Sequence, residues 1–567
     1  MKSIAALLLL LAILSCKQTS RSQQINPYHY TPVKRIVVKH GAIATANPLA
    51  SEIGAMILKK GGNAVDAAIA AQLALAVVYP AAGNIGGGGF MVIHLKNGKN
   101  TAIDFREEAP GKATRDMYLD KKGNADPQLS RNGDLSVGVP GTVAGIFLAH
   151  KEYGKLPMKE LIQPAIDLAE RGYAITATEA RWLNENQQDF KKYNTIMPVF
   201  VKESDWHAGD TLLQKDLAHT LELIRDSGQA GFYEGETAQK IVSEMQRGNG
   251  MITLQDLKNY QAKERTPAVF DYKGYTIETM PLPSSGGVVL QQMLGMLSNY
   301  PVDQYGFESV KSVQLMTEIE RRAYADRAQY LGDPDFVKVP VKELVSESYL
   351  KQRMTNYNPD YATPSDSISA GVIPPESEET THLSVVDDSG NAVAVTYTLN
   401  NLYGSQVVVG HAGFFLNDEM DDFSAKPGAP NMFGLLGTEA NAIAPGKRML
   451  SSMTPTIVLK NDKPYLVIGS PGGATIITSV FQTIVNILDF NINVSDAVNK
   501  PKFHEQWKPD VVYVEKGFPD SVKQAMERMG YSFKERGSIG RTEVIKMTPD
   551  SIVAVADDRG DDSAAGY

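Results

Sequence analysis

The chain has 567 residues, of which 43% are hydrophobic and 21% are charged, a balance that is ordinary for a soluble globular protein with a large core. Its formal net charge of −9 and the lack of a long Lys/Arg run argue against a nucleic acid as partner. The single cysteine excludes an intrachain disulfide.

The N-terminus carries the pattern of a secretory signal. Lys2 precedes an apolar run at residues 4–14 that is too short to span a bilayer, so we expect residues 1–15 to be a signal peptide. The run ends in Ile13-Leu14-Ser15-Cys16, which resembles a bacterial lipobox. This resemblance implies lipidation of Cys16, a polar tether over residues 16–34, and export to the periplasmic or cell-surface side of a bacterial membrane. An ordinary signal peptide with an incidental cysteine is the alternative.

Two helices are predicted near the start of the folded part. Asn47-Pro48 and Gly61-Gly62 carry the N-cap, first-turn and stop residues of the first helix. Asn63 caps the second helix, Ala64–Val78, whose composition is rich in alanine and almost entirely apolar. A helix that is apolar on nearly every side is expected to be deeply buried.

Consecutive glycines at Gly86–Gly89 precede two predicted strands, at residues 91–94 and 102–105. A phosphate-binding loop would need Lys-Ser/Thr after the glycines, and none follows. Close packing of the backbone is therefore the preferred interpretation of these glycines.

The region from about 136 to 360 is predicted to be mainly helical. Pro164–Gly172 has helix start and stop residues, and a long helix is expected from about 308 to 331. The nine histidines show no pair with zinc-ligand spacing, and no G-x-S-x-G elbow occurs, so we expect neither a metal nor a cofactor.

Residues 379–404 are predicted to enter a β-hairpin. Ser384–Asp387 is rich in valine, Asp388–Asn391 supplies turn residues, and Ala392–Thr398 alternates larger and smaller side chains. The preceding Pro374–Glu379 is typical of an exposed, extended loop. On pattern alone, this stretch is a linker that enters a sheet.

The whole string T-T-H-x-S-V-x4-G-N-x-V-x-V-T-x-T-L-N-x2-Y-G, from Thr380 to Gly404, resembles the signature of the γ-glutamyltransferases (γ-glutamyltranspeptidases), which are N-terminal-nucleophile hydrolases. The resemblance implies that a precursor cuts itself between Glu379 and Thr380, and that Thr380 is then the nucleophile. The chemistry suits this residue, because an N-terminal amine with a pKa near ~7.7–8 is a usable base at neutral pH. In the uncut chain the same nitrogen is an amide without basicity, so cleavage would switch the enzyme on.

The resemblance also assigns the residues that bind the donor's zwitterion. Arg106, in a D-F-R-E-x-A-P segment, corresponds to the residue that holds the α-carboxylate, for which a guanidinium fork is well suited. Taken alone, an arginine beside Glu107 and Glu108 would be read as a surface ion pair. Glu419 and Asp422 match the residues that bind the α-amino group, and a solvated acidic turn is the alternative for them.

Further positions resemble the reaction centre of the family. Thr398 corresponds to the residue that hydrogen-bonds the nucleophile, and Asn400, two residues on, would face the same way and hold the substrate carboxylate. Ser451-Ser452 matches the paired serines of the family that contact the carboxylate of the γ-glutamyl donor. Gly472-Gly473 matches an oxyanion loop whose backbone N–H groups face the tetrahedral intermediate.

Two residues need separate treatment. His382 stands two residues after the nucleophile, and we interpret it as a packing residue rather than a base. Phe433 falls in a lid-like loop at 426–438, where many bacterial members carry a tyrosine whose hydroxyl bonds the residue corresponding to Asn400. Phenylalanine lacks that hydroxyl, which leaves the balance of hydrolysis against transpeptidation open.

The resemblance implies an α+β fold, the αββα four-layer sandwich of the Ntn hydrolases, cut into a large subunit (35–379, after the tether) and a small catalytic subunit (380–567). The expected reaction moves a γ-glutamyl group from glutathione or another γ-glutamyl donor to water, an amino acid or a peptide. The alternatives are a relative that acts on acylated β-lactams or poly-γ-glutamate, and an inactive lipoprotein that binds γ-glutamyl compounds.

Overall fold

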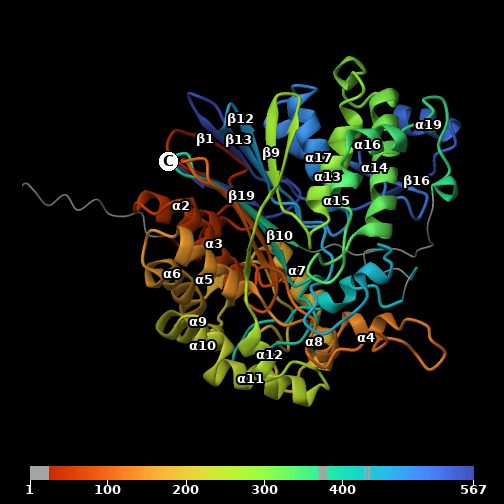
Figure 1. The fold of residues 1–567 in the computed structure, drawn as a ribbon. Helices are drawn as coiled ribbons and strands as arrows, with labels where there is room; N and C mark the ends of the chain where they lie inside the picture. Colours follow the sequence, from red (N-terminus) through yellow and green to blue (C-terminus); the bar gives the residue numbers. More distant parts are fainter. Residues whose placement is uncertain (1–24, 369–379, 427, 430, 432–433) are drawn as a thin grey trace, which may run out of the picture.

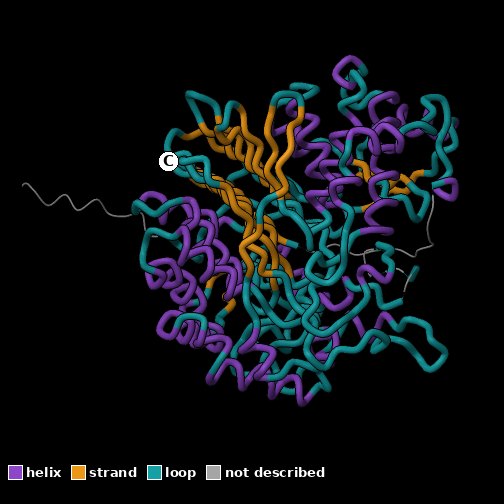
Figure 2. Tube along the Cα trace, in the orientation of Figure 1, coloured by secondary structure: helices purple, strands orange, loops and turns teal. Residues whose placement is uncertain are grey.

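The computed structural model describes residues 25–368, 380–426, 428–429, 431 and 434–567. Within these ranges the chain forms two seven-stranded sheets that lie face to face, with helices on the outer face of each (Figure 1, Figure 2). The predictions for the signal peptide, Cys16, the Pro374–Glu379 loop and Phe433 fall outside the described residues. No helix in the described ranges has both the length and the apolar character needed to cross a bilayer.

The first sheet carries the predicted hairpin at its centre. In order across the sheet, its strands are β19 (Ser563–Gly566), β2 (Ala42–Thr45), β10 (Thr381–Val386), β11 (Ala392–Thr398), β3 (Gly88–His94), β4 (Asn100–Phe105) and β7 (Lys263–Arg265). Every neighbouring pair is antiparallel. The two predicted strands of the hairpin are thereby confirmed, as are those predicted on either side of residues 95–99.

The second sheet is formed by one strand from the start of the described chain and six from its middle and end. Its order is β1 (Arg35–Val38), β18 (Ile552–Val555), β17 (Glu543–Met547), β13 (Lys463–Gly469), β12 (Thr456–Lys460), β9 (Tyr275–Thr279) and β8 (Ala268–Tyr272). Small sheets are formed by β14 (Phe503–His504), β15 (Val512–Glu515) and β16 (Phe533–Arg536), and by β5 (Tyr173–Ala174) and β6 (Thr211–Leu212).

Eleven of the described helices belong to the N-terminal half of the chain; α2, α3 and α5 lie over the first sheet, and α6 packs on the outside of α3 (Figure 1). They are α2 (Pro48–Lys59), α3 (Ala64–Val78), α4 (Pro127–Arg131), α5 (Thr142–Tyr153), α6 (Met158–Arg171), α7 (Ala177–Glu185), α8 (Gln187–Tyr193), α9 (Lys215–Ser227), α10 (Ala230–Tyr233), α11 (Gly235–Arg247) and α12 (Leu254–Asn259).

The outer face of the second sheet is covered by later helices, of which α13, α14 and α17 contribute most to the core beneath them. They are α13 (Gly286–Leu297), α14 (Val310–Tyr330), α15 (Val341–Leu344), α16 (Glu347–Arg353), α17 (Thr475–Leu488), α18 (Val494–Asn499) and α19 (Asp520–Arg528). Short 3-10 turns complete the described structure: η1 (Asp134–Ser136), η2 (Val302–Gln304), η3 (Ser365–Ser367), η4 (Glu419–Asp422) and η5 (Glu439–Asn441).

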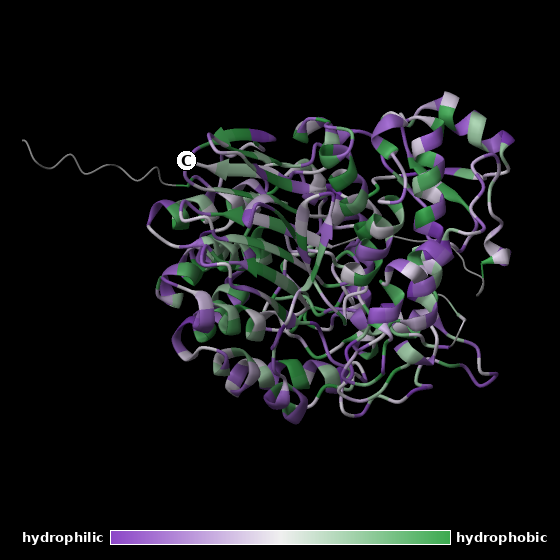
Figure 3. Ribbon diagram, turned by 45° about the horizontal axis from the view of Figure 1, so that its top comes forward, coloured by the Kyte–Doolittle hydropathy of each residue, from purple (hydrophilic) through white to green (hydrophobic). Residues whose placement is uncertain are grey.

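Separate apolar layers hold the sandwich together. One contains the inward faces of both sheets, including Ala44, Phe90, Ile457 and Val467, and the other two lie between each sheet and its helices. Hydrophobic residues accordingly concentrate on the central strands and hydrophilic ones on the outer helical turns (Figure 3). α3, which is buried along its whole length, forms the layer against the first sheet, as its composition predicts.

One expectation for the middle of the chain is wrong in part. The helix expected from Pro164 begins at Met158, with Pro164 inside it. Leu161 and Ile162 are fully buried in that first part, and their burial offsets the proline's cost of about 3 kcal/mol. The region 136–360 is mainly helical, as expected, and it also supplies β8 and β9, of which β9 pairs with β12.

Candidate active site

Thr380 lies at one end of the central hairpin, directly before β10. Thr381 pairs with Tyr397 in the antiparallel register of β10 and β11, and continuing that register by one residue places Thr380 opposite Thr398. Both threonines are 3% exposed. The hairpin therefore brings the predicted nucleophile and its predicted hydrogen-bonding neighbour together at the same end of two central strands of the first sheet.

A small pocket opens beside this pair. Eight of the predicted site residues line it together with three apolar side chains, and the full lining is Arg106, Thr380, Thr398, Asn400, Asp422, Leu435, Ser451, Ser452, Met453, Gly473 and Ile476. Glu419 lies behind Arg106, and Gly472 is next to Gly473 in the chain. The predicted residues thus converge from β4, β11, η4, β10 and the loops around β12 and β13.

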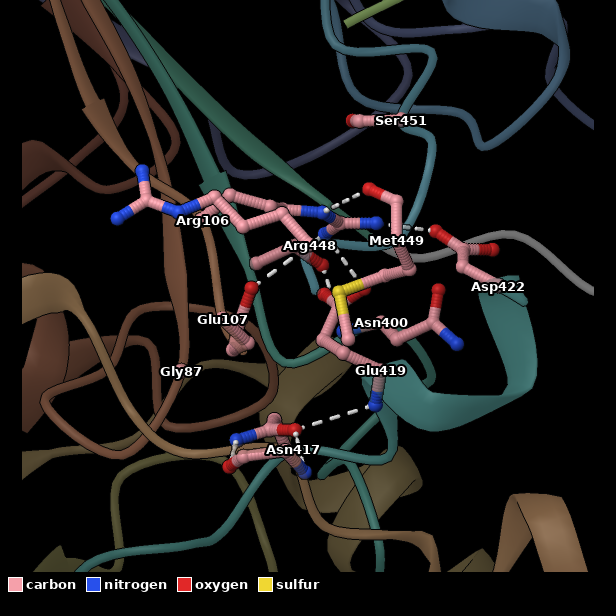
Figure 4. Close-up of polar contacts among 12 residues, drawn as sticks. Gly87, Arg106, Glu107, Asn400, Asn417, Glu419, Asp422, Arg448, Met449 and Ser451 are labelled. Carbon is pink, nitrogen blue, oxygen red and sulfur yellow. Dashed lines mark hydrogen bonds and ion pairs between the residues drawn. The ribbon is translucent and has the colours of Figure 1, made fainter. Parts of the chain in front are cut away.

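Arg106 is the centre of a buried charged cluster (Figure 4). It follows β4 and is completely buried, and its two terminal nitrogens lie 2.5 Å from Glu419 Oε2 and 2.5 Å from Asp422 Oδ2. Nη1 is also 3.5 Å from Glu107 Oε2, and Nε donates to the Met449 carbonyl at 3.3 Å. Burial opposes the charged form of Arg106, but Glu419 and Asp422 raise its pKa above the ordinary value.

Three carboxyl groups therefore surround one guanidinium. Burial raises the pKa of Glu107 to about 8 despite Arg106, and burial likewise raises the pKa of Glu419 and of Asp422. Glu107 Oε1 and Glu419 Oε1 are buried and have no hydrogen-bond partner among the described residues. The cluster therefore contains carboxyl oxygens that can still accept hydrogen bonds, and it is suited to bind an additional cationic group such as an ammonium.

The backbone around the cluster is fixed by two asparagines. Asn400 has a φ of 84°, and its N–H donates to Thr398 Oγ1 at 2.8 Å while Nδ2 donates to the Asp418 carbonyl at 3.2 Å. Asn417 Oδ1 accepts from the N–H of Glu419 at 3.1 Å and from that of Gly138 at 2.9 Å (Figure 4). Asn417 is a positioning residue that sequence reasoning missed, although it directly precedes the acidic string.

Arg327, on α14, is a second buried arginine that the sequence analysis missed. Its Nη2 donates to Ser452 Oγ at 3.0 Å and its Nε to Ser285 Oγ at 2.9 Å, while Ser285 Oγ donates to the Ser451 carbonyl at 2.6 Å. Burial lowers the pKa of Arg327 to about 10. The positive charge of Arg327 thus lies behind the serines that are predicted to bind the carboxylate. No sequence motif near Arg327 predicted this position.

Gly472 and Gly473 have φ values of 132° and 53°, both in the region that favours glycine. A Cβ on Gly472 would stand 2.5 Å from Thr475 Oγ1, and Thr475 Oγ1 donates to the Gly472 carbonyl at 2.8 Å. The Tyr324 hydroxyl donates to the carbonyl of Ala474. The loop is therefore a fixed backbone turn at the start of α17, as an oxyanion loop requires.

His382 and the glycine run pack as the sequence suggested. His382 is fully buried, its ring nitrogens are 2.8 Å from Thr396 Oγ1 and 3.0 Å from Ser384 Oγ, and burial lowers its pKa to about 3. A Cβ on Gly87 would lie 2.1 Å from the Thr398 carbonyl, so this glycine serves close approach of β3 and β11.

The described part of the lid-like loop also contacts the cluster. Asn431 Nδ2 donates to Asp422 Oδ1 at 2.9 Å, and Leu435 lines the pocket. Phe433 and Glu379 lie outside the described residues.

Comparison with known proteins agrees with the geometry. The sequence model of the γ-glutamyltranspeptidase family matches residues 50–567. A glutathione hydrolase proenzyme of Escherichia coli (strain K12) is 48% identical over 541 residues, which cover 93% of this chain and 92% of that relative. The crystal structure of a cephalosporin acylase from Bacillus halodurans superposes with a TM-score of 0.83 at 27% identity, covering 96% and 99% of the two chains. A Helicobacter pylori γ-glutamyltranspeptidase structure gives a TM-score of 0.56 at 49% identity, covering 57% of this chain and 93% of the other.

The four-layer fold, with a buried threonine at the start of a central strand, defines the class of N-terminal-nucleophile hydrolases. Within that class, the chain belongs to the γ-glutamyltranspeptidase family of enzymes, which confirms the resemblance and the predicted fold.

Proposed function

We propose that this enzyme cuts its own precursor between Glu379 and Thr380 and then transfers γ-glutamyl groups from glutathione or related donors to water, amino acids or peptides. The observation that carries the proposal is the position of Arg106, Glu419 and Asp422 in and behind the pocket lined by Thr380. The guanidinium of Arg106 can bind a carboxylate through two nitrogens, and the carboxyl oxygens of Glu419 and Asp422 can accept hydrogen bonds from an ammonium group. A γ-glutamyl donor presents both groups on its α-carbon.

The reaction follows from the groups at the pocket. After cleavage, the free amine of Thr380 accepts the proton of its own hydroxyl as Oγ1 attacks the γ-amide carbonyl. The backbone of the Gly472–Gly473 loop stabilises the oxyanion. The C–N bond breaks, the proton passes to the leaving amine, and a γ-glutamyl ester on Thr380 remains. Water, activated by the same amine, or an acceptor amine then attacks the ester and restores the hydroxyl.

Donor binding is an exchange of ion pairs. In the described structure Arg106 is already bound to Glu419 and Asp422, so its charge is compensated within the protein. The donor's carboxylate replaces these acids at the guanidinium, helped by Ser451 and Ser452, while the ammonium group takes the released carboxylates. A donor that lacks either group leaves a buried charge without its partner, which is costly.

An acylase of acylated β-lactams is the second candidate, because a cephalosporin acylase shares the whole fold. The buried cluster around Arg106 favours a γ-glutamyl donor over an acylated β-lactam, because the charges of the cluster match the carboxylate and ammonium groups of a free amino acid. Comparing turnover of γ-glutamyl and glutaryl amides with the same leaving group separates the two candidates.

The N-terminus supports a further part of this proposal, that the enzyme is exported and anchored through a lipid on Cys16. The support is the apolar run followed by the lipobox-like Ile13–Cys16. A Cys16→Ser variant is expected to move from the membrane fraction to the soluble fraction, and equal membrane retention of both proteins would contradict the anchor.

Intact mass of the purified protein and of a Thr380→Ala variant tests the central claim. We expect two fragments for the natural sequence, one beginning at Thr380 and ending at Tyr567, and a single chain for the variant. Glutathione turnover should accompany only the cut protein. An uncut natural protein that is stable for days at neutral pH would contradict self-activation.

A further inference from the structure

The last described residues before the proposed cleavage site, Ser365–Ile368, are bound by residues that follow the cleavage site in the chain. Trp507 Nε1 donates to the Ile368 carbonyl at 2.7 Å and to the Ser365 carbonyl at 3.2 Å. Trp507 is 1% exposed and Ile368 4%. After cleavage Ser365 and Ile368 would belong to the large chain and Trp507 to the small one, so these bonds would join the two products.

Ser365 is held by charged groups as well. Its N–H donates to Asp510 Oδ2 at 2.8 Å, and Arg321 Nη1, on α14, donates to Ser365 Oγ at 2.7 Å. The same guanidinium nitrogen is 2.5 Å from Asp510 Oδ1. Ser365 therefore has its N–H, hydroxyl and carbonyl groups all bonded, by three different side chains.

The loop that presents the indole is itself held in an unusual conformation. Trp507 has a φ of 72°, which is rare for a bulky residue and persists only where surrounding contacts impose it. Its N–H donates to Glu505 Oε2 at 2.9 Å, and Glu505 is completely buried. The backbone here is thus fixed so that the indole N–H faces the two large-chain carbonyls.

We propose that Trp507, Arg321 and Asp510, together named the Trp507 clamp, position the precursor for self-cleavage. The inference rests on the proposed self-activation and adds the residues that guide it. Ile368 stands eleven residues before Glu379, and Thr381 is fixed in β10, so the clamp and the strand hold both sides of the connecting peptide. Fixing both ends restricts the connecting peptide, so less entropy must be lost when the carbonyl of residue 379 turns toward the hydroxyl of Thr380, which follows it directly in the chain.

The three residues are positioning residues, because they contact the segment and not the reacting atoms. Their effect should fall on the rate of self-cleavage and not on turnover by enzyme that is already cut. This separates the clamp from the pocket residues, whose loss impairs both the chemistry and donor binding.

A Trp507→Phe variant tests the inference, since it keeps an aromatic ring but removes the N–H. The full-length precursor is made by cell-free synthesis, and its conversion to two chains is followed by intact mass, alongside kcat/KM for glutathione of the fully cut protein. We expect self-cleavage to slow by about fivefold or more, because the indole N–H no longer donates to the Ile368 and Ser365 carbonyls, with kcat/KM within about twofold of the natural enzyme.

The matched control is Trp206→Phe. Trp206 is also buried, at 8% exposure, and its Nε1 donates to a backbone carbonyl, that of Phe200, at 2.8 Å within the large chain. This variant should be cut at the natural rate. Should Trp507→Phe fold poorly, Asp510→Asn, whose side chain is 43% exposed, is expected to show a smaller slowing of the same kind.

Equal cleavage rates for the natural protein, Trp507→Phe and Asp510→Asn would overturn the clamp while leaving the proposed function intact. Equal slowing of both tryptophan variants would also overturn it, because the cause would then be general destabilisation. A natural protein that neither cuts itself nor turns over glutathione would instead overturn the proposed function, and the clamp with it.

Discussion

At the scale of single residues, the site is dominated by charges that compensate one another inside the protein. Arg106 is paired with two carboxylates before any donor arrives, and Glu107 stands beside it with a pKa raised by burial to about 8. Such a cluster is stable only while its charges remain balanced. We therefore expect it to discriminate strongly against ligands that bring only one of the two required charges.

Glu419→Gln tests this discrimination. The amide keeps the shape of the side chain but removes one negative charge that the donor's ammonium would use. We expect kcat/KM for a γ-glutamyl anilide to fall about 10- to 100-fold, which corresponds to roughly 1.4–2.8 kcal/mol, whereas turnover of the glutaryl anilide, which lacks the amine, should change little.

The control for this variant is Asp421→Asn in the same turn. Asp421 Oδ1 accepts from the Ser130 hydroxyl and lies 3.8 Å from Arg131 Nε. This substitution should affect both anilides to the same small extent. A proportional loss on both anilides for Glu419→Gln would mean that Glu419 does not bind the amine.

At the scale of elements, the position of Thr380, the proposed nucleophile, depends on how closely β3, β10 and β11 approach one another. Gly87 immediately precedes β3, and a Cβ at this position would stand 2.1 Å from the carbonyl of Thr398. The end of β11, which places Thr398 opposite Thr380, thus requires a residue without a side chain at Gly87. The packing of Gly87 against the Thr398 carbonyl therefore helps to set the position of Thr398 relative to Thr380.

Gly87→Ala is expected to lower stability by about 1–3 kcal/mol through overpacking and to slow self-cleavage, because the carbonyl of Thr398 must shift. Thermal unfolding and the cleavage time course measure the two effects. Gly537→Ala is the control, since a Cβ there meets nothing within 4 Å. Unchanged cleavage in Gly87→Ala would show that β11 adjusts without moving Thr398.

At the scale of the whole molecule, buried carboxyl groups make stability depend on pH. Glu179 is 4% exposed, and its oxygens accept from the N–H of Thr176 at 2.8 Å and from the hydroxyl of Tyr173 at 2.8 Å. Burial raises its pKa to about 7. The folded protein therefore keeps this proton to near pH 7, whereas the unfolded chain releases it near pH 4.5.

The contribution of Glu179 to stability is therefore complete below about pH 4.5 and is lost as the pH rises through about 7. A Glu179→Gln variant cannot ionise there, so its unfolding free energy should fall less between pH 5 and pH 8, by on the order of 2 kcal/mol. Denaturant unfolding at the two pH values measures the difference. Parallel pH profiles for the two proteins would contradict the assigned titration.

The sequence by itself determined the elements with strong local signals and the identity of the family. Capping residues at Asn47 and Asn63 and the alternation before Thr398 define α2, α3 and β11, because caps and side-chain periodicity act within a few residues. The ordered motifs also named ten residues that the fold brings to or beside one pocket.

The tertiary structure alone determined which side chains from distant parts of the sequence form ion pairs and hydrogen bonds. The pairing of Arg106 with Glu419 and Asp422, the placement of Arg327 behind Ser452, and the contact of Trp507 with Ile368 join positions more than a hundred residues apart. The start of α6 at Met158 and the pairing of β9 with β12 were likewise set by burial in the final core. No local pattern encodes such contacts, because their free energy arises only when the sheets and helices are packed together and water is excluded.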